Sequence, residues 1–369
     1  MIMINKVVIF LGPKKYFKKF LDENIGENTR SNFHELIKYM DEKDSNKYDL
    51  DNLIVNADDY SSVNYHVLLN FAAIVTSKFN IKNLYLHNPP KRVEDSFKFY
   101  YKDNIDYKIH EYQSISRENL IKIYSNLNSD IQGQSNCKKQ IISALYRLSI
   151  NKKNKPIVLI LYGPSGVGKT QTVKNISETL GGELLRIQFS MMHTSENYEY
   201  IFGSEHSKRS FARDLMSRET NIILFDEFDK VNSSLYNAFY ELFDEGKYTD
   251  TNYEVDLRQA IFICTSNFKN EQEIEKTLGS AMFSRISCCI KFDELSKIDK
   301  EIVLNKHYND IISSLNDEEK HIIGDTNILE WFGNNIGRFN NIRILKKNIE
   351  NAIFDKLTDE FIINTYTKN

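Results

Sequence analysis

The segment LYGPSGVGKT occupies residues 161–170, directly after the apolar run Ile157–Leu161 and directly before the helical pattern Gln171–Leu180. Its spacing is GxxxxGKT, in which glycines let the loop fold so that backbone N–H groups converge on a phosphate. The N-terminus of the following helix adds a partial positive charge. A strand, this loop and a helix in that order predict a phosphate-binding loop in an α/β fold.

Each part of this loop has an expected chemical role. The Lys169 ammonium would neutralise the β- and γ-phosphates of a nucleoside triphosphate, and the Thr170 hydroxyl would help to hold Mg²⁺. The competing interpretation is a glycine-rich turn without a ligand, which the strand and the helix on either side disfavour. The residues predicted to surround the phosphates are Gly163, Pro164, Ser165, Gly166, Val167, Gly168, Lys169, Thr170 and Gln171.

Two acids follow a second strongly apolar run, Ile222–Phe225. Asp226 would accept hydrogen bonds from the water shell of Mg²⁺, and Glu227 would act as the general base that polarises the attacking water. Strands that end in solvated acids are common, so this pair alone would carry little weight. Together with the phosphate loop it predicts repeated hydrolysis, because a nucleotide switch needs no adjacent Glu.

The composition fits a folded protein of several domains. A length of 369 residues is too great for one typical core and predicts two or three domains. Hydrophobic residues make up 41% of the chain and charged residues 27%, which excludes wholesale disorder. The 48 basic residues are balanced by 51 acidic ones. Nucleic acid is therefore disfavoured as a partner, since binding to its backbone usually needs a basic excess.

The cysteines and the N-terminus favour a cytoplasmic location. Cys137, Cys264, Cys288 and Cys289 form no CxxC pair, so we expect reduced thiols rather than disulfides or a zinc site. The N-terminal MIMINKVVIFLG is apolar only briefly and turns into KKYFKKF, which predicts a buried strand and no signal peptide. No stretch approaches the ~18 apolar residues of a membrane span.

Apolar runs and amphipathic segments divide the chain into four parts. Residues 1–115 predict a small α/β domain with a largely parallel sheet, and residues 116–129 a connector helix. Residues 130–293 contain stronger strands, apolar on both faces, as in a parallel sheet covered by helices. Residues 294–369 are mostly helical, although a last apolar run, Phe361–Tyr366, would fit a strand. The other expected strands are Val7–Leu11, Leu53–Val55, Leu84–Leu86, Tyr107–Tyr112, Ile157–Leu161, Ile222–Phe225 and Ala260–Thr265. No internal repeat is evident.

Residues 130–369 resemble an AAA+ module, and specifically the second ATPase domain of the Clp/Hsp100 chaperones. The resemblance implies a P-loop core of αβα type with a parallel sheet, a helical lid, and binding of ATP and Mg²⁺. The matching segments, in family order and at near-family spacing, are IQGQ at 131–134, GPSGVGKT at 163–170, FDEFDK at 225–230, FDEGKYTD at 243–250, CTSN at 264–267, FSRIS at 283–287 and NIRILKK at 341–347.

The resemblance also implies roles for single residues outside the phosphate loop. Asn267 matches the sensor-1 residue that orients the attacking water beside Glu227. Arg285 matches the arginine finger, which reaches the nucleotide of a neighbouring subunit and stabilises charge in the transition state. Ile131 and Gln132 begin the segment that would line the adenine through backbone contacts.

Two arginines compete for the sensor-2 role, which couples the position of the lid to the bound nucleotide. Arg343 opens a helical pattern and matches the family position, whereas Arg338 lies close by. For both, the ordinary alternative is a solvated surface residue. A finger that acts between subunits implies a homo-oligomer, in this family a ring of six subunits.

The resemblance fails in the segment Phe202–Phe211. Hsp100 modules carry a Gly-aromatic-Val-Gly pore loop there, whereas this segment is shorter and polar, and Phe211 begins a helical pattern that would bury it. The hydrophobic tripeptide that docks unfoldases on the ClpP protease is also missing. Torsins likewise lack the pore aromatic, but they lack the arginine finger and carry a signal peptide. We therefore expect no threading of stable folded substrates.

The first domain offers few chemical signals. It has no GxGxxG, so a dinucleotide site is disfavoured. Asp58 and Asp59 follow an expected strand and could mimic a receiver-type acidic pocket, although a solvated loop is the simpler interpretation. His87, His110 and His206 have no ligand-spaced partners and are expected to be ordinary surface or half-buried residues.

Two classes of function remain open at this point. The chain is either an ATP-hydrolysing remodeller that binds a protein partner through residues 1–115, or an ATP-gated assembly switch with slow or no turnover, as in some bacterial defence ATPases. Glu227 and Arg285 favour turnover, whereas the missing pore aromatic favours the switch. The partner, the pathway and the ring size are not specified by the sequence.

Overall fold

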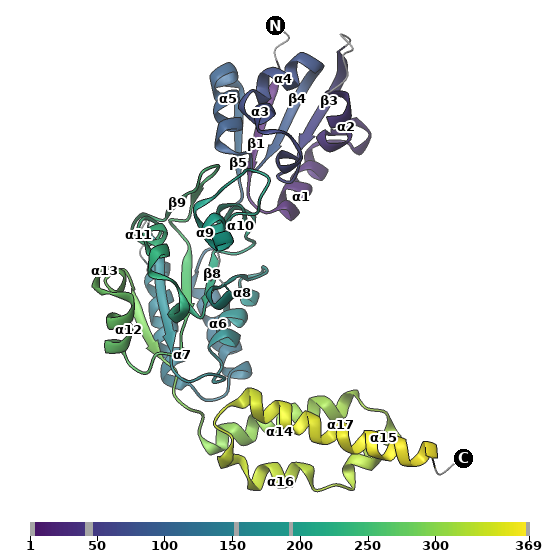
Figure 1. Cartoon of the computed structure of the whole chain (residues 1–369), viewed down its shortest axis with the longest axis vertical. Coiled ribbons are helices and arrows are strands. Elements are labelled where there is room, and N and C mark those ends of the chain that lie inside the picture. The colour runs from purple at the N-terminus through teal and green to yellow at the C-terminus, as the bar shows by residue number, and fades with distance from the viewer. Residues whose placement is uncertain (1–3, 41–46, 151–154, 192–194, 367–369) are drawn as a thin grey trace. The chain divides into compact units, whose positions relative to one another are not determined.

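The computed structural model describes residues 4–40, 47–150, 155–191 and 195–366. They form two five-stranded sheets with helices between the strands, a hairpin and a C-terminal group of helices (Figure 1). By packing, the chain divides into two compact units, the first being Met1–Ser114, Lys152–Val158 and Leu180–Ile263, and the second Ile115–Asn151, Leu159–Thr179 and Cys264–Asn369. Within the described ranges, no helix is both long enough and apolar enough to cross a bilayer.

The first sheet has the strand order β2-β3-β4-β1-β5, and its neighbouring strands are parallel. The register places Val8 opposite Tyr85 on one side and Asp106 on the other. β1 lies between β4 and β5, inside a parallel sheet whose two faces are covered by helices. It is therefore apolar and buried from Val7 to Phe10. The strands are β1 (Lys6–Leu11), β2 (Arg30–Asn32), β3 (Tyr48–Val55), β4 (Phe79–His87) and β5 (Ile105–Ile109).

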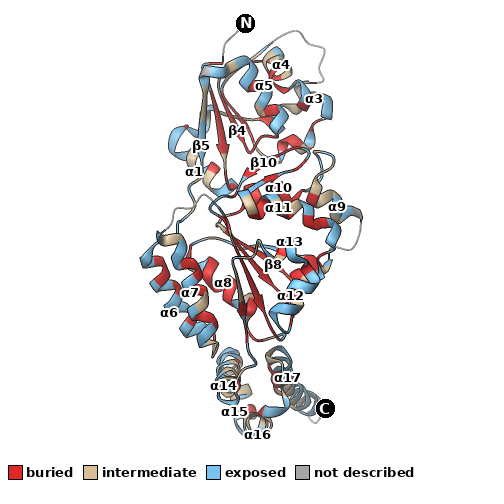
Figure 2. Ribbon diagram, turned by 90° about the vertical axis from the view of Figure 1, so that its left-hand side faces the viewer, coloured by how far each residue is buried: buried red, intermediate tan, exposed pale blue. Residues whose placement is uncertain are grey.

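Helices cover both faces of this sheet. On one face, Phe17 and Leu21 of α1 pack against Val8 and Phe10. On the other, a larger cluster joins the strands to Phe71 and neighbouring apolar residues. Figure 2 shows much of β4 in red, the colour of buried residues. The helices are α1 (Lys14–Asn24), α2 (Phe33–Met40), α3 (Tyr65–Leu69), α4 (Phe71–Lys78) and α5 (Lys91–Tyr101).

The second sheet has the strand order β12-β6-β11-β8-β7. The pairs β12–β6 and β7–β8 are parallel, and β8 and β11 are buried at every residue, as the sequence predicts for strands covered on both faces. The strands are β6 (Ile157–Tyr162), β7 (Leu185–Gln188), β8 (Ile222–Asp226), β11 (Ile261–Thr265) and β12 (Cys288–Lys291). An antiparallel hairpin, β9 (Lys247–Thr249) and β10 (Glu254–Asp256), precedes β11.

The remaining helices belong to the second half of the chain. Those before the last strand are α6 (Arg117–Asp130), α7 (Ser135–Ile150), α8 (Lys169–Thr179), α9 (Ser195–Phe202), α10 (Phe211–Ser217), α11 (Tyr236–Glu245), α12 (Glu271–Leu278) and α13 (Ser280–Phe283). The C-terminal group is α14 (Lys297–Ser314), α15 (Asp317–Gly324), α16 (Ile328–Asn334) and α17 (Ile342–Tyr366). The C-terminal group has its own core, in which Leu304, Ile323 and Leu345 are buried.

Most expected elements are present, with one clear error. The α/β class with parallel strands is confirmed, and each of the other expected strands overlaps an observed one. The prediction of a strand at Phe361–Tyr366 is wrong, because these residues continue α17. A helix satisfies its backbone locally, whereas a terminal strand needs a partner edge.

Two polar residues of the first domain are more buried than expected. His87 is 2% exposed, so the expectation that it is a surface or half-buried residue is wrong. Asp59, expected in a solvated loop, is 6% exposed, and its carboxylate accepts a hydrogen bond from the backbone N–H of Asn56 at 2.7 Å. Burial raises the pKa of Asp59. His110 and His206 are half-buried, as expected.

Candidate functional site

The loop between β6 and α8 depends on glycine for its shape. Gly163 has a φ of +130°, and a Cβ there would lie 2.1 Å from the carbonyl oxygen of Phe292. Gly166 has a φ of +81°, and a Cβ there would lie 2.1 Å from the side-chain oxygen of Asn341. Positive φ and close approach together exclude larger residues at both positions. The shape of the loop therefore requires glycine at two positions of the GxxxxGKT segment.

Lys169 begins α8, and its side chain is held against this loop. The Nζ atom donates to the carbonyl oxygens of Gly163 and Pro164, each at 2.6 Å, and to Oδ1 of Asn267 at 3.3 Å. The residue is 8% exposed although it carries a charge. Burial of an ammonium is tolerated only when its donors are satisfied, as they are here. The structure thus brings together the predicted phosphate-binding lysine and the predicted sensor-1 amide.

Two further segments of the second unit approach the loop. Ile131 is buried, and its Cγ2 lies 3.6 Å from where a Cβ of Gly168 would be. Gln132 follows it and is half-buried. Asn341, directly before α17, meets the loop at Gly166, and its Oδ1 accepts from the backbone N–H of Arg343 at 2.9 Å. The predicted adenine segment and the start of the sensor-2 helix therefore both border the loop.

The remaining predicted arginines are not drawn into the loop. Arg343 and its competitor Arg338 are both exposed. Arg285 is half-buried just after α13, and its Nη1 donates to the carbonyl oxygen of Ala281 at 2.6 Å. The proposed roles of these three arginines therefore stay predictions.

The acidic pair lies at the end of β8 in the first unit. Asp226 is 4% exposed, and its Oδ2 accepts two hydrogen bonds from Arg186, from Nε at 2.8 Å and from Nη2 at 2.5 Å. This pairing balances the buried charge. Glu227 is half-buried and has a φ of +58°, a left-handed conformation that costs a non-glycine residue about 1–3 kcal/mol. Such strain is typical of functional positions.

Each unit contributes one of the predicted oxygen donors for Mg²⁺. The Thr170 hydroxyl and the Asp226 carboxylate are oxygen donors, the kind that Mg²⁺ prefers. The phosphate loop follows β6, the sensor-1 residue follows β11, and the acidic pair lies at the end of β8. These three strands are consecutive in the second sheet.

Comparisons with known proteins indicate which kind of domain contains these residues. The family model described as AAA domain (Cdc48 subfamily) matches residues 154–309. The chaperone protein ClpB of Malacoplasma penetrans is 24% identical over 276 residues, which cover 67% of this chain and 39% of ClpB. The ATP-binding subunit ClpL of the ATP-dependent Clp protease of Staphylococcus aureus (strain MRSA252) is 26% identical over 287 residues, covering 68% of this chain and 40% of ClpL. Residues 154–309 thus match an AAA domain, and the chain is similar to AAA+ ATPases of the Clp/Hsp100 type.

The AAA+ match has defined limits. The chain spans about two fifths of the length of these relatives. The family model begins at residue 154, so it does not include the first domain.

Two residues at the AAA+ site were not predicted from the sequence. Arg186 holds the carboxylate of Asp226, and Asn341 contacts the phosphate loop. Arg186 lies on β7, a four-residue strand with weak apolar character, so neither the strand nor its charge gave a signal. Asn341 could have been found, because it opens the segment NIRILKK and Asn is a frequent helix cap.

Proposed function

We propose that this protein hydrolyses ATP with Mg²⁺ and uses the energy to remodel a protein partner or its own assembly. The observation that carries the proposal is the buried Lys169 ammonium, held between the phosphate-loop carbonyls and Asn267. A lysine in that position is a preformed point charge for the β- and γ-phosphates. The names of the relatives, a chaperone and an ATP-binding protease subunit, support remodelling.

The residues would divide the reaction between them. Lys169 and the loop N–H groups bind and orient the phosphates, and Asn267 positions the attacking water. Glu227 takes a proton from that water as general base. Mg²⁺, held through Thr170 and the water shell on Asp226, would supply charge neutralisation for the γ-phosphate.

We further propose that the active form is a ring of identical subunits. Arg285 would reach the nucleotide of the neighbouring subunit, and Arg343 would report the nucleotide to the lid. A ring of six is the expectation from the Clp/Hsp100 type. In this proposal residues 130–293 form the large ATPase domain, residues 294–369 the lid, residues 116–129 the connector, and residues 1–115 the domain for a protein partner, in the cytoplasm.

A second function, an ATP-gated assembly switch, has one observation in its favour. The aromatic side chain closest to the expected pore-loop position, Phe211, is 0% exposed within α10. The sequence predicted this burial, and a buried ring is not available to grip a substrate. The strained Glu227 favours turnover, because a switch has no need of a general base.

Two variants separate binding from hydrolysis. Lys169→Ala should abolish ATP binding, whereas Glu227→Gln should bind ATP and lose most hydrolysis, typically by 10²–10⁴-fold. Lys174→Ala, an exposed lysine on the same helix, and Glu241→Gln, an exposed acid on α11, are matched controls. Equal hydrolysis by wild type and Glu227→Gln would contradict the base assignment. Slow hydrolysis with ATP-dependent assembly in the wild type would favour the switch.

A further inference from the structure

The two sheets of this chain have the same strand order. With strands numbered along the first domain, the first sheet has the order 2-3-4-1-5. In the second sheet the strands from first to fifth are β6, β7, β8, β11 and β12, and read from the β7 edge the order is again 2-3-4-1-5. The sequence shows no repeat, so this repetition is visible only in the fold.

The agreement extends to single hydrogen bonds beyond the strand ends. The N–H of Asn88 donates to the carbonyl oxygen of Phe10 at 2.9 Å, and the N–H of Ser266 donates to that of Leu161 at 3.0 Å. Each donor follows the fourth strand of its sheet. These bonds align FLGP at 10–13 with LYGP at 161–164.

A second bond, from the residue after the fifth strand, gives the same alignment. The backbone N–H of His110 donates to the carbonyl oxygen of Leu11 at 2.8 Å, and the backbone N–H of Phe292 donates to that of Tyr162 at 2.7 Å. The glycine that follows is crowded in both places. Gly12 has a φ of +147°, and a Cβ there would lie 2.4 Å from Cβ of His110, as a Cβ of Gly163 would meet Phe292.

The first domain lacks the parts that bind and hydrolyse nucleotide. After Pro13 the chain enters α1 at Lys14, whereas Ser165–Gly168 stand between Pro164 and Lys169. Those four residues supply the N–H groups that would surround a phosphate. The acids are missing as well: Asn56 and Ala57 follow the last apolar residue of β3, where Asp226 and Glu227 follow that of β8.

The corresponding corner of the first domain is closed by its own side chains. The N–H of Gly12 donates to Oδ1 of Asn88 at 2.9 Å. The carbonyl oxygen of Gly12 accepts from Nδ2 of Asn88 at 2.9 Å and from Nε2 of His87 at 2.8 Å. All three bonds are buried, so the backbone groups of this corner are already used.

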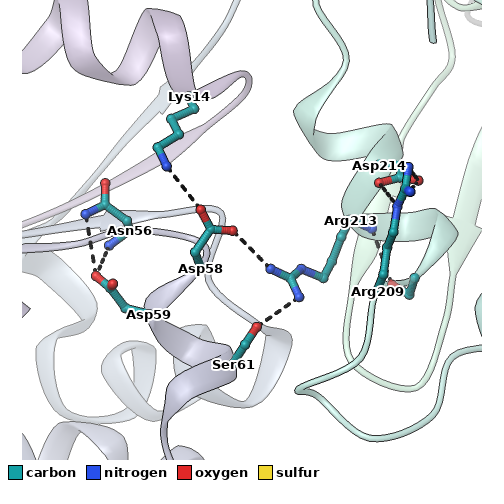
Figure 3. Close-up of polar contacts among 9 residues, drawn as sticks. Lys14, Asn56, Asp58, Asp59, Ser61, Arg209, Arg213 and Asp214 are labelled. Carbon is teal, nitrogen blue, oxygen red and sulfur yellow. Dashed lines mark hydrogen bonds and ion pairs between the residues drawn. The ribbon is translucent and has the colours of Figure 1, made fainter. Parts of the chain in front are cut away.

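The turn after β3 instead contacts the segment 203–213 of the AAA+ domain. Arg213 donates to Oγ of Ser61 at 2.9 Å and pairs with Asp58 at 3.4 Å, and Asp58 also pairs with Lys14 at 3.1 Å (Figure 3). The Arg213 side chain is only 19% exposed, so its charge depends on these partners.

A neighbouring contact joins the same two segments. Nε2 of His206 lies 2.8 Å from the carbonyl oxygen of Val63, which can only accept, and its ring stacks on Tyr65 with centroids 5.9 Å apart. Segment 203–213 contains most of the stretch in which Hsp100 modules carry a pore loop and this chain does not. Here that stretch contacts the first domain.

We infer that residues 4–110 are a nucleotide-free second copy of the P-loop fold, whose β3 turn serves to hold segment 203–213. The domain is thus a docking element inside the chain. The prediction that each chain binds one nucleotide rests on the proposed function. The docking of segment 203–213 does not.

Nucleotide stoichiometry of the full chain tests the first half of the inference. A fluorescent, non-hydrolysable ATP analogue with Mg²⁺ should bind once per chain in wild type and Lys14→Ala, and not at all in Lys169→Ala. Two sites in the wild type, or a site in Lys169→Ala that Lys14→Ala removes, would overturn the inference and leave the proposed function intact. No binding to the wild type would refute the proposed function and agree with a nucleotide-free first domain.

Limited trypsin digestion tests the docking, because Lys208 and Arg209 are exposed cleavage sites within the segment. Loss of both acceptors in Asp58→Ala/Ser61→Ala should raise cleavage there by about tenfold. Asp51→Ala, which breaks an exposed ion pair with Lys82 on the same sheet, is the matched control and should leave cleavage unchanged.

Arg213→Gln removes the same contacts without altering the first domain, so it covers the case in which the double variant fails to fold. It should raise cleavage after Lys208 to a similar extent. Wild-type cleavage rates in Arg213→Gln, or equal acceleration in Asp51→Ala, would overturn the docking.

Discussion

The first domain should lose stability as the pH falls below 6.5, because His87 is buried in its neutral form. Its ring stacks on Phe17, with centroids 4.6 Å apart, and Nε2 donates to Gly12. Nδ1, buried as well, has no hydrogen-bond partner within the described structure. Burial lowers the pKa of His87 from its ordinary 6.5 to about 4, against the smaller opposing influence of the Gly12 bond and Asp58.

The direction and the size of this loss of stability follow from proton linkage. The unfolded chain takes up a proton on His87 below about pH 6.5, but the folded chain does so only below about pH 4. Stability is therefore complete above pH 6.5 and decreases as the pH falls toward 4. For these two pKa values the loss between pH 7.5 and 4.5 is about 2.5 kcal/mol, or about 70-fold in the opening equilibrium.

Hydrogen exchange measured by mass spectrometry on peptides from β1 and β4, corrected for intrinsic rates, gives this opening free energy at each pH. His87→Gln removes the titrating group. The opening free energy of this variant should therefore change by about 2.5 kcal/mol less than that of the wild type over the same pH range. His66→Gln, at an exposed position on α3, should behave as wild type. If His87→Gln and wild type share one pH dependence, the buried neutral imidazole is not the cause.

Three further changes have defined outcomes. Gly163→Ala should lower the free energy of unfolding by about 3 kcal/mol, measured in urea, because its Cβ meets a backbone carbonyl at positive φ; an unchanged midpoint would contradict the loop geometry. Arg186→Ala should lower the Mg²⁺ concentration for half-maximal ATPase activity, since the guanidinium no longer competes for Asp226; a higher requirement would argue against this. Mixing Arg285→Ala with Lys169→Ala protein should restore part of the ATPase activity, whereas a fully active monomer would exclude a finger acting between subunits.

Local signals in the sequence were enough to predict the centre of the AAA+ site. The phosphate loop, α8 and the acids after β8 are each encoded within about ten neighbouring residues, so spacing and apolar runs identify them. The role of Asn267 followed from the resemblance, not from spacing, and its contact with Lys169 was seen only in the structure.

What the sequence did not predict depends on contacts between distant segments. Strand order in the first domain is set by pairings such as Val8 with Asp106, which leave no local pattern. The burial of His87 likewise depends on Phe17, far away in the chain. At Phe361–Tyr366 the apolar run was real, but the preceding helix continued through it.

The contact of Asn341 with Gly166 places one end of α17 at the phosphate loop. The helix has 25 residues and, at about 1.5 Å per residue, is about 37 Å long. A tilt of about 10° pivoting at Asn341 would carry the far end through about 6 Å. A rearrangement of the loop that tilted the helix would thus be amplified along its length, so α17 is long enough to act as a lever arm between the phosphate loop and its own far end.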